Sequence, residues 1–393
     1  MRRVYLDYSA TTPVDPEVLQ EMLPYFTEKF GNANSMHSFG QEGGAAVDAA
    51  RRKIAELLGV KPTEIYFTSG GTEGDNWALK GCASAYSGRG RHVIVSSIEH
   101  AALIGSAHQL EREGYRVTFL PVTDKGIVTP EILEKYITDD TSIVSVMLAN
   151  NEIGTVQPVK ELAAVAHAHH ALFHTDAVQA MGSIPVDVND LGVDLMTFSG
   201  HKFYGPKGIG VLYIRSGVKP DKLIAGGHQE RTMRGGTTNV PAVVGIAKAL
   251  EIALRDLDAN AARIAALRDR FVAGVKQRIP YIVYNGDEKK RLPQNANFSF
   301  EFLEGESILM RLDLAGVACS SGSACSSGSL DPSHVLLATG LPVEKAHGSI
   351  RFTFGKYTTV EDVDYTLDKL TEIITTLREM SPLFAEFRDG VKM

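Results

Sequence analysis

Residues 198–210 read FSGHKFYGPKGIG and place a lysine in a turn between two apolar segments. The segments Leu195–Phe198 and Gly210–Ile214 have the short apolar pattern that is typical of buried strands. Lys202 therefore follows the end of an expected strand, in a turn rich in Gly, Ser and His. A lysine held in such a turn could act as a nucleophile toward a carbonyl group, although most single lysines are solvated surface residues.

Short apolar segments alternate with helical patterns from about residue 45 to 215. The expected strands are Glu64–Thr68, His92–Ser96, Arg116–Pro121, Ser142–Leu148, Leu172–Thr175, Leu195–Phe198 and Gly210–Ile214. The expected helices are Gln41–Leu58, Ala101–Glu113, Pro130–Tyr136 and Val159–His170, followed by Pro241–Leu257 and Ala261–Arg278. This alternation predicts an α/β fold with a mainly parallel, seven-stranded sheet covered by helices on both faces.

After residue 280 the pattern changes to that of a smaller α+β domain. The expected strands are Tyr281–Tyr284, Asn297–Phe302 and Ile350–Phe354, and the expected helices are Gly305–Ala315 and Val360 to about Glu379. We therefore expect a large domain, residues 14–257, and a small domain made of residues 1–13 with 258–393.

Charge and cysteine content limit the possible functions. The chain of 393 residues has 40 Lys and Arg against 47 Asp and Glu, which argues against nucleic acid or an anionic membrane as the main partner. The longest apolar run, Ile143 to Ala149, is far shorter than the ~18 residues of a membrane span, and no signal-peptide pattern opens the sequence. Only Cys82, Cys319 and Cys325 are present, too few for a disulfide framework, so we expect a cytoplasmic protein.

Polar residues also follow the ends of four other expected strands. They are residues 69–74 (SGGTEG), 99–100 (EH), 150–155 (NNEIGT) and 174–179 (HTDAVQ). Because the carboxyl ends of parallel strands meet at one edge of a sheet, we expect these residues to converge on one crevice. Each group also has an ordinary explanation: a Gly-rich turn, a structural His, turn-forming amides, or a buried carboxylate with a cationic partner.

Taken together, these groups match the needs of one cofactor. Pyridoxal phosphate needs a lysine that binds its aldehyde, a carboxylate facing its pyridine nitrogen, a group stacked on its ring and a cradle for its phosphate. The glycines of residues 69–74, followed by a helix N-terminus, suit the cradle, and the turn lacks the Lys-Ser/Thr of a nucleotide P-loop. The sequence therefore predicts pyridoxal 5'-phosphate as the cofactor.

The chain resembles cysteine desulfurases of the NifS/IscS type, in the aminotransferase class V branch of fold type I pyridoxal-phosphate enzymes. The resemblance runs from YLDYSATTP at residues 5–13 to IRF at 350–352, and its most specific motifs are SGHK at 199–202 and ACSSGSLDPSHV at 324–335. It implies the fold type I transferase architecture and conversion of L-cysteine to L-alanine. It also implies a homodimer and a sulfur-acceptor protein such as an iron–sulfur scaffold.

The resemblance implies a role for individual residues as well. The expected cofactor-binding residues are Lys202 at the aldehyde, Asp176 at the pyridine nitrogen, Gln179 at the phenolic oxygen, His100 on the ring, and Gly71, Thr72, Ser199 and His201 at the phosphate. Thr237, in the motif RGGT at 234–237, would reach the phosphate of the neighbouring subunit. Asn151 and Arg351 would bind the substrate carboxylate, which a guanidinium can grip with two parallel hydrogen bonds. The expected catalytic residues are Cys325, Lys202 and His100.

Three positions depart from the family pattern. Ser9, Ala33 and Gly74 stand where Asn or Ala, Pro, and Ser are usual. None of these changes removes a catalytic group, so they bear on the tuning of the phosphate site and not on the reaction.

Cys325 lies in a segment dense in Ser and Gly, a composition typical of a loop of about residues 319–332. The resemblance implies that its thiolate takes sulfur from the substrate as a persulfide, while Lys202 moves the Cα proton and His100 assists proton transfer. Cys325 could also bind an iron–sulfur cluster transiently, and no resident metal is expected. Cys319 could pair with Cys325, but an incidental role is expected, and Cys82 is expected to be a small apolar filler.

Other functions remain open at this point. A selenocysteine lyase or an aminotransferase would use Lys202 and Asp176 equally well, but would not require the motif around Cys325. A sulfur carrier without turnover would not require the full set of cofactor residues. The sequence does not indicate whether the sulfur serves iron–sulfur clusters, nitrogenase or tRNA thiolation.

Overall fold

The structure is a computed structural model that describes residues 2–321 and 332–390. Its strands are β1 (Val4–Tyr5), β2 (Ile65–Thr68), β3 (His92–Ser96), β4 (Arg116–Leu120), β5 (Thr141–Ser145), β6 (Leu172–Asp176), β7 (Leu195–Ser199), β8 (Gly210–Ile214), β9 (Ile282–Tyr284), β10 (Asn295–Phe300), β11 (Val317–Ala318), β12 (Ser320–Ser321) and β13 (Ser349–Thr353). Its helices are α1 (Pro16–Met22), α2 (Pro24–Thr27), α3 (Ser38–Leu58), α4 (Gly71–Ala85), α5 (Ala101–Arg112), α6 (Pro130–Tyr136), α7 (Val159–Ala168), α8 (Val188–Leu191), α9 (Val240–Arg255), α10 (Leu257–Arg278), α11 (Gly305–Leu314), α12 (His334–Ala338), α13 (Val343–Ala346), α14 (Val360–Met380) and α15 (Pro382–Arg388). None of the helices in the described ranges is long and apolar enough to span a membrane.

The central sheet has seven strands in the order β2-β8-β7-β6-β5-β3-β4. Strands β3 to β7 run parallel, whereas β8 is antiparallel to both of its neighbours. This confirms the predicted mainly parallel, seven-stranded sheet. One expected strand, Ser142–Leu148, is shorter than predicted because β5 ends at Ser145. The buried backbone beyond β5 still follows β6, since the Leu148 N–H donates to the Asp176 carbonyl (2.8 Å).

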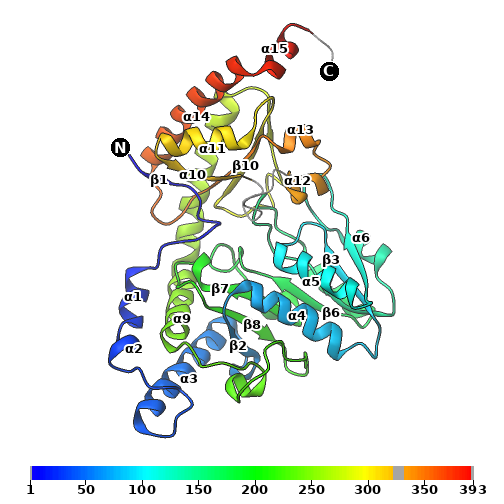
Figure 1. The fold of residues 1–393 in the computed structure, drawn as a ribbon, viewed down its shortest axis with the longest axis vertical. Helices are drawn as coiled ribbons and strands as arrows, with labels where there is room; N and C mark the ends of the chain where they lie inside the picture. The colour runs from blue at the N-terminus through cyan, green and yellow to red at the C-terminus, as the bar shows by residue number, and fades with distance from the viewer. Residues whose placement is uncertain (1, 322–331, 391–393) are drawn as a thin grey trace.

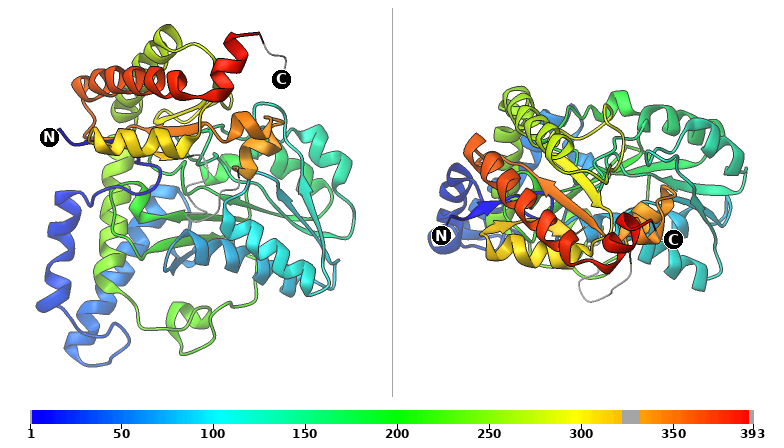
Figure 2. Two further views of the ribbon diagram at one scale, coloured as in Figure 1. Left: turned by 45° about the horizontal axis from the view of Figure 1, so that its top comes forward. Right: turned by 90° about the horizontal axis from the view of Figure 1, so that it is seen from above.

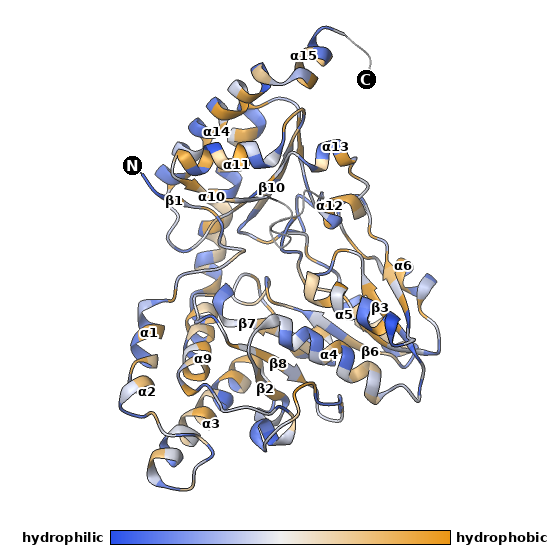
Figure 3. Cartoon of the chain, in the orientation of Figure 1, coloured by the Kyte–Doolittle hydropathy of each residue, from blue (hydrophilic) through white to orange (hydrophobic). Residues whose placement is uncertain are grey.

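Helices cover both faces of this sheet (Figure 1). On one face α3, α6, α7 and α9 pack against apolar residues such as Ile94 and Val211; on the other, α4 and α5 pack against Val93 and Leu212. Neighbouring residues of a strand thus point to opposite sides, which explains why apolar residues occur at consecutive strand positions and not only at every second one. The covering helices alternate apolar and polar residues, as expected for one buried and one exposed side (Figure 3).

A second sheet of four strands, in the order β12-β13-β10-β9, lies beyond the carboxyl edge of the first (Figure 2). Its own core contains Phe271, Phe298 and Phe352, together with Val4 and Leu6 from the N-terminus. The N-terminus joins it because β1 pairs with β11 and Asp7 bridges to Thr353. Helix α10 continues from α9 toward this sheet (Figure 1).

Candidate active site

A crevice of about 300 Å³ lies where the strand ends of the central sheet face the four-stranded sheet. Its lining contains ten of the residues that the sequence predicts for the site: Gly71, Thr72, His100, Asn151, Asp176, Gln179, Ser199, His201, Lys202 and Arg351. They come from segments spread over most of the chain, and they meet as the rule for open α/β sheets predicts.

Lys202 ends a single 3₁₀ turn, Gly200–Lys202, that begins directly after β7. Its Nζ donates to the backbone carbonyls of Ser9 (2.6 Å) and Ala10 (2.9 Å). The turn closes tightly: a Cβ on Gly205 would lie 2.8 Å from the Gly200 carbonyl oxygen, so only glycine fits there. The N-terminal segment and this turn therefore fix the amino group at the crevice wall.

The turn between β2 and α4 has the features of an anion cradle. Helix α4 begins at Gly71 without a side-chain cap on its first N–H groups. A Cβ on Gly71 would lie 2.8 Å from Val178 Cγ2, so glycine is required for this close approach. Ser199 and His201 line the same crevice from the turn after β7. Unpaired N–H groups and the positive end of the helix dipole suit a phosphate.

Asp176 ends β6, and its Oδ1 accepts from the N–H of Val178 (2.8 Å). Burial raises the pKa of Asp176, and the charges of His100 and Lys202 oppose this rise. A protonated ring nitrogen facing the carboxylate would oppose it further, so the site suits a pyridinium. Gln179 Nε2 donates to the Ser9 carbonyl (3.0 Å), which holds it beside the crevice.

His100 caps α5, and its Nδ1 accepts from the N–H of Ala102 (3.2 Å). Burial lowers the pKa of His100 and favours the neutral ring. Since Nδ1 is the acceptor, the proton of the neutral ring lies on Nε2. His100 can therefore present a neutral aromatic face, as a ring-stacking group requires.

Arg351 enters the crevice from β13 of the four-stranded sheet, and its side chain is 3% exposed. Its Nη1 donates to the Asn151 carbonyl (3.0 Å) and its Nη2 to Asp7 Oδ1 (2.9 Å). Its Nε has no hydrogen-bond partner among the residues that the structure describes. A buried guanidinium with a donor still to satisfy suits a substrate carboxylate.

The crevice also contains residues that the sequence reasoning missed. Asp75 lies on α4, one helical turn after Gly71, and burial together with the charge of Asp176 raises its pKa well above the usual range. It contacts Thr197, which also bonds His174 Nε2 (3.0 Å). The four-residue spacing from Gly71 was the signal that could have placed Asp75 in the crevice.

Gly74, one of the departures from the family pattern, has a steric explanation. A Cβ at this position would lie 2.6 Å from the Thr197 methyl carbon. We expect Gly74→Ser to lower the free energy of unfolding by about 1–3 kcal/mol, because the buried strand cannot move aside. Urea unfolding checks this, and adding Thr197→Ser, which keeps the hydroxyl and removes the methyl, should restore most of the loss. A Gly74→Ser variant as stable as the parent would contradict it.

Glu99 is a buried carboxyl beneath the crevice, and its Oε1 accepts from Ser96 Oγ (2.5 Å) and the Met147 N–H (2.8 Å). Burial raises the pKa of Glu99 to about 8, and these two hydrogen bonds oppose the rise. From about pH 5 to 8 the folded protein retains a proton that the unfolded chain has lost. The contribution of Glu99 to the free energy of unfolding therefore falls as the pH rises over this range.

A glutamine at position 99 would keep both hydrogen bonds and remove the titration. We expect the free energy of unfolding of Glu99→Gln, measured relative to that of the parent, to increase by about 2–4 kcal/mol as the pH rises from 5 to 8. Urea midpoints at several pH values measure this gain, with the exposed Glu28→Gln as control. A difference between Glu99→Gln and the parent that does not change with pH would contradict the expectation.

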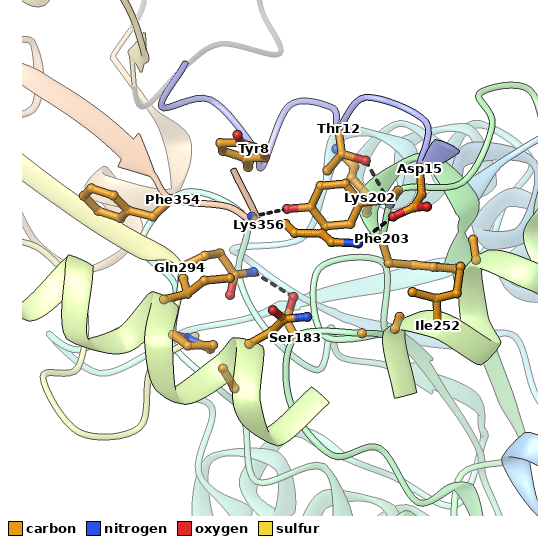
Figure 4. Close-up of a pocket in the computed structure, with 18 of the residues that line it drawn as sticks. Tyr8, Thr12, Asp15, Ser183, Lys202, Phe203, Ile252, Gln294, Phe354 and Lys356 are labelled. Carbon is orange, nitrogen blue, oxygen red and sulfur yellow. Dashed lines mark hydrogen bonds and ion pairs between the residues drawn. The ribbon is translucent and has the colours of Figure 1, made fainter. Parts of the chain in front are cut away.

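A second cavity of about 60 Å³ shares Lys202 and Gln179 with the crevice (Figure 4). At its edge Lys356 Nζ pairs with Asp15 Oδ2 (2.6 Å), and the Lys356 N–H donates to the Tyr204 hydroxyl (2.6 Å). These contacts join the N-terminal segment, the residues after Lys202 and the segment that follows β13.

One predicted residue lies elsewhere, and another is outside the described residues. Thr237 is exposed and does not line the crevice, and Cys325 lies outside the described residues. The segment before Thr237 is held by the buried pair of Arg51 Nη2 with Glu230 Oε1 (2.7 Å) and by Arg234 Nε bonding Glu73 Oε1 (2.9 Å). Glu73 is in the first turn of α4, so this segment is tied to the helix that begins the anion cradle.

Comparisons with known proteins place this geometry in context. Residues 4–366 match the aminotransferase class-V family. A cysteine desulfurase IscS of Dictyoglomus turgidum is 53% identical over 100% of this chain and 99% of its own length, and the human cysteine desulfurase is 48% identical over 100% of this chain and 86% of its own. A solved structure described as a NifS-like protein has a TM-score of 0.90 at 41% identity, covering 95% of this chain and 100% of that chain. Another, described as SspA in complex with cysteine, has a TM-score of 0.80 at 34% identity over 91% of this chain and 100% of its own.

Proposed function

Because the chain belongs to the aminotransferase class-V family and is a pyridoxal-phosphate-dependent cysteine desulfurase, we propose that the residues gathered in the crevice carry out that reaction and that Cys325 receives the sulfur. The observation that carries the proposal is the meeting of Lys202, Asp176 and Arg351 in one buried crevice.

The lining of the crevice supports the cofactor roles that the resemblance implies. Lys202 would bind the aldehyde, Asp176 would face the pyridine nitrogen, Gln179 the phenolic oxygen, and His100 would stack on the ring. The phosphate would lie on the N-terminus of α4, held by Gly71, Thr72, Ser199 and His201. When bound, the cofactor supplies an electron sink that weakens bonds at the substrate Cα.

The residues proposed to bind the substrate act on the two ends of L-cysteine. Arg351 and Asn151 bind the carboxylate of L-cysteine, with Arg351 Nε as the open donor. Lys202 Nζ removes the proton from Cα and returns one later, and the carbonyls of Ser9 and Ala10 hold this amino group near the substrate. His100 Nε2 carries the proton that can pass to or from the substrate thiol.

The sulfur atom then passes from L-cysteine to the Cys325 thiol. The Cys325 thiolate attacks the substrate sulfur, an S–S bond forms, and the Cβ–S bond breaks. The electron pair of the broken bond stays with the substrate carbon, which takes up a proton and becomes the methyl group of L-alanine. The products are L-alanine and a Cys325 persulfide, so atoms and electrons balance.

A product assay tests this function. The protein loaded with pyridoxal phosphate is incubated with L-cysteine and a thiol reductant, and alanine and sulfide are measured. One alanine per sulfide supports the proposal. Amino-group transfer to a 2-oxo acid without sulfur release would overturn it in favour of an aminotransferase.

The proposal includes a homodimer in which Thr237 completes the phosphate site of the neighbouring subunit. Its support is an apolar surface for a second copy: Phe26, Phe30, Met36 and Phe39 are each more than half exposed. Exposed apolar side chains gathered in this way are typical of subunit interfaces.

The proposal also covers organisation and partners. The separate cores of the two sheets support a large domain of residues 14–257 and a small domain of residues 1–13 with 258–393. The persulfide sulfur passes to an acceptor protein such as an iron–sulfur scaffold. A cytoplasmic location suits this role, because a reducing compartment keeps the Cys325 thiol available.

A further inference from the structure

Glu152 is a buried carboxylate beside the substrate site, and the reaction as described makes no use of it. It is 5% exposed and follows Asn151, whose carbonyl accepts from Arg351 Nη1. Its own backbone carbonyl accepts from Asn295 Nδ2 (3.0 Å) and Asn297 Nδ2 (3.1 Å) of β10. Residues of the four-stranded sheet therefore fix the backbone of this acid.

Within residues 2–321 and 332–390, the carboxylate of Glu152 has one specific partner. Its Oε2 accepts from the hydroxyl of Ser333, which is 4% exposed and lies 181 residues away in sequence. Ser333 caps α12, since its hydroxyl also accepts from the Leu336 N–H (3.2 Å). The next residue, His334, bonds the Glu99 carbonyl through Nε2 (3.0 Å). The start of α12 therefore forms hydrogen bonds with Glu152 and with Glu99. The residues next to these two acids, Asn151 and His100, line the crevice.

Ser333 follows Cys325 by eight residues in the sequence. On the other side of Cys325, Ser320 of β12 pairs with Arg351 of β13. Arg351 in turn bonds the Asn151 carbonyl. Residues 151–152 consequently connect to the described chain both before and after the interval that contains Cys325.

The chemistry of the contact between Glu152 and Ser333 favours a functional role for Glu152 over simple filling of space in the core. Burial raises the pKa of Glu152 to about 7, while the hydrogen bond from Ser333 and the charge of Arg351 oppose the rise. A buried carboxyl is costly unless its partners satisfy it, and an apolar side chain would fill the same volume with less penalty. The acid lies where it links Asn151, which lines the crevice, to Ser333.

We propose that Glu152 is a positioning residue for sulfur transfer: through Ser333 it fixes the start of α12, eight residues after Cys325 in the sequence, beside the substrate crevice. The proposal rests on the proposed function, in which Cys325 accepts the sulfur. Glu152 is not among the residues that line the crevice, so its loss should slow sulfur transfer and leave substrate binding unchanged.

The test uses the full-length protein loaded with cofactor and compares Glu152→Ala with Ser333→Ala. We expect each variant to bind L-cysteine within about twofold of the parent by spectral titration. We expect the single-turnover rate of persulfide formation to fall about 10- to 100-fold, because small misplacements of reacting groups have effects of this size. The double variant should be no slower than the slower single variant.

Two controls sharpen the comparison. Glu152→Gln keeps an acceptor for Ser333 and should recover most of the transfer rate. Thr339→Val removes a hydrogen bond at the other end of α12, from the Thr339 hydroxyl to the Leu336 carbonyl (2.7 Å), and should react like the parent.

The outcomes separate the two proposals. Parent-like transfer rates in both Glu152→Ala and Ser333→Ala, while Cys325→Ala is inactive, overturn the positioning role alone. Equal loss of L-cysteine binding and of rate also overturns it, since this indicates a structural role. Normal turnover in Cys325→Ala would instead overturn the proposed function.

Discussion

Lys202→Ala should lose both the visible absorption of the lysine-bound cofactor and the production of alanine from L-cysteine. Lys202 is the lysine that lines the crevice, in the turn after β7, and in the proposed reaction the same Nζ also moves the proton at Cα. We expect the rate of alanine formation to fall by about 10³-fold or more, because covalent binding and proton transfer are lost together. Absorption spectra of the loaded protein and an alanine assay measure the two effects.

Lys207→Ala is the matched control, since Lys207 lies in the same turn but does not line the crevice. It should retain the absorption band and the activity. If Lys202→Ala kept the band of a covalently bound cofactor, another amine would be the attachment point, and the assignment of the crevice would be wrong.

Cys325→Ala should bind L-cysteine but form no persulfide. The residues proposed to hold substrate and cofactor remain, so the spectral change on adding L-cysteine should persist. Alanine formation should fall by about 10²-fold or more, because the group proposed to attack the substrate sulfur is missing. Rapid mixing with L-cysteine and a measurement of alanine separate the two steps.

Cys319→Ala is the control for the loss of a neighbouring thiol. Burial raises the pKa of Cys319 far above that of a reactive thiol, so it should contribute nothing to turnover. Normal alanine formation in Cys325→Ala would show that another group accepts the sulfur.

Much of the crevice could be predicted from the sequence. Asp176 ends a strand and Lys202 and His100 follow one, and in a mainly parallel sheet such strand ends share one edge. The apolar segments also predicted every strand of the central sheet, because helices cover both of its faces and apolar residues therefore occur at consecutive strand positions.

Other features depend on contacts that no local pattern encodes. Strands β1 and β11 have two residues each and pair across most of the chain, so periodicity could not reveal them. Asp75 lines the crevice because it lies on the same side of α4 as Gly71, four residues earlier. The bond between Glu152 and Ser333 exists only because the two sheets are packed together.

Finding which cysteine carries the transferred sulfur directly tests whether Cys325 accepts it. The loaded protein is given one equivalent of L-cysteine that carries isotopically labelled sulfur, its thiols are alkylated, and the peptides containing Cys82, Cys319 and Cys325 are analysed by mass spectrometry. We expect the label on Cys325, as an alkylated persulfide, with an equal amount of alanine formed. Label on Cys82 or Cys319, or alanine without label on any cysteine, would contradict it.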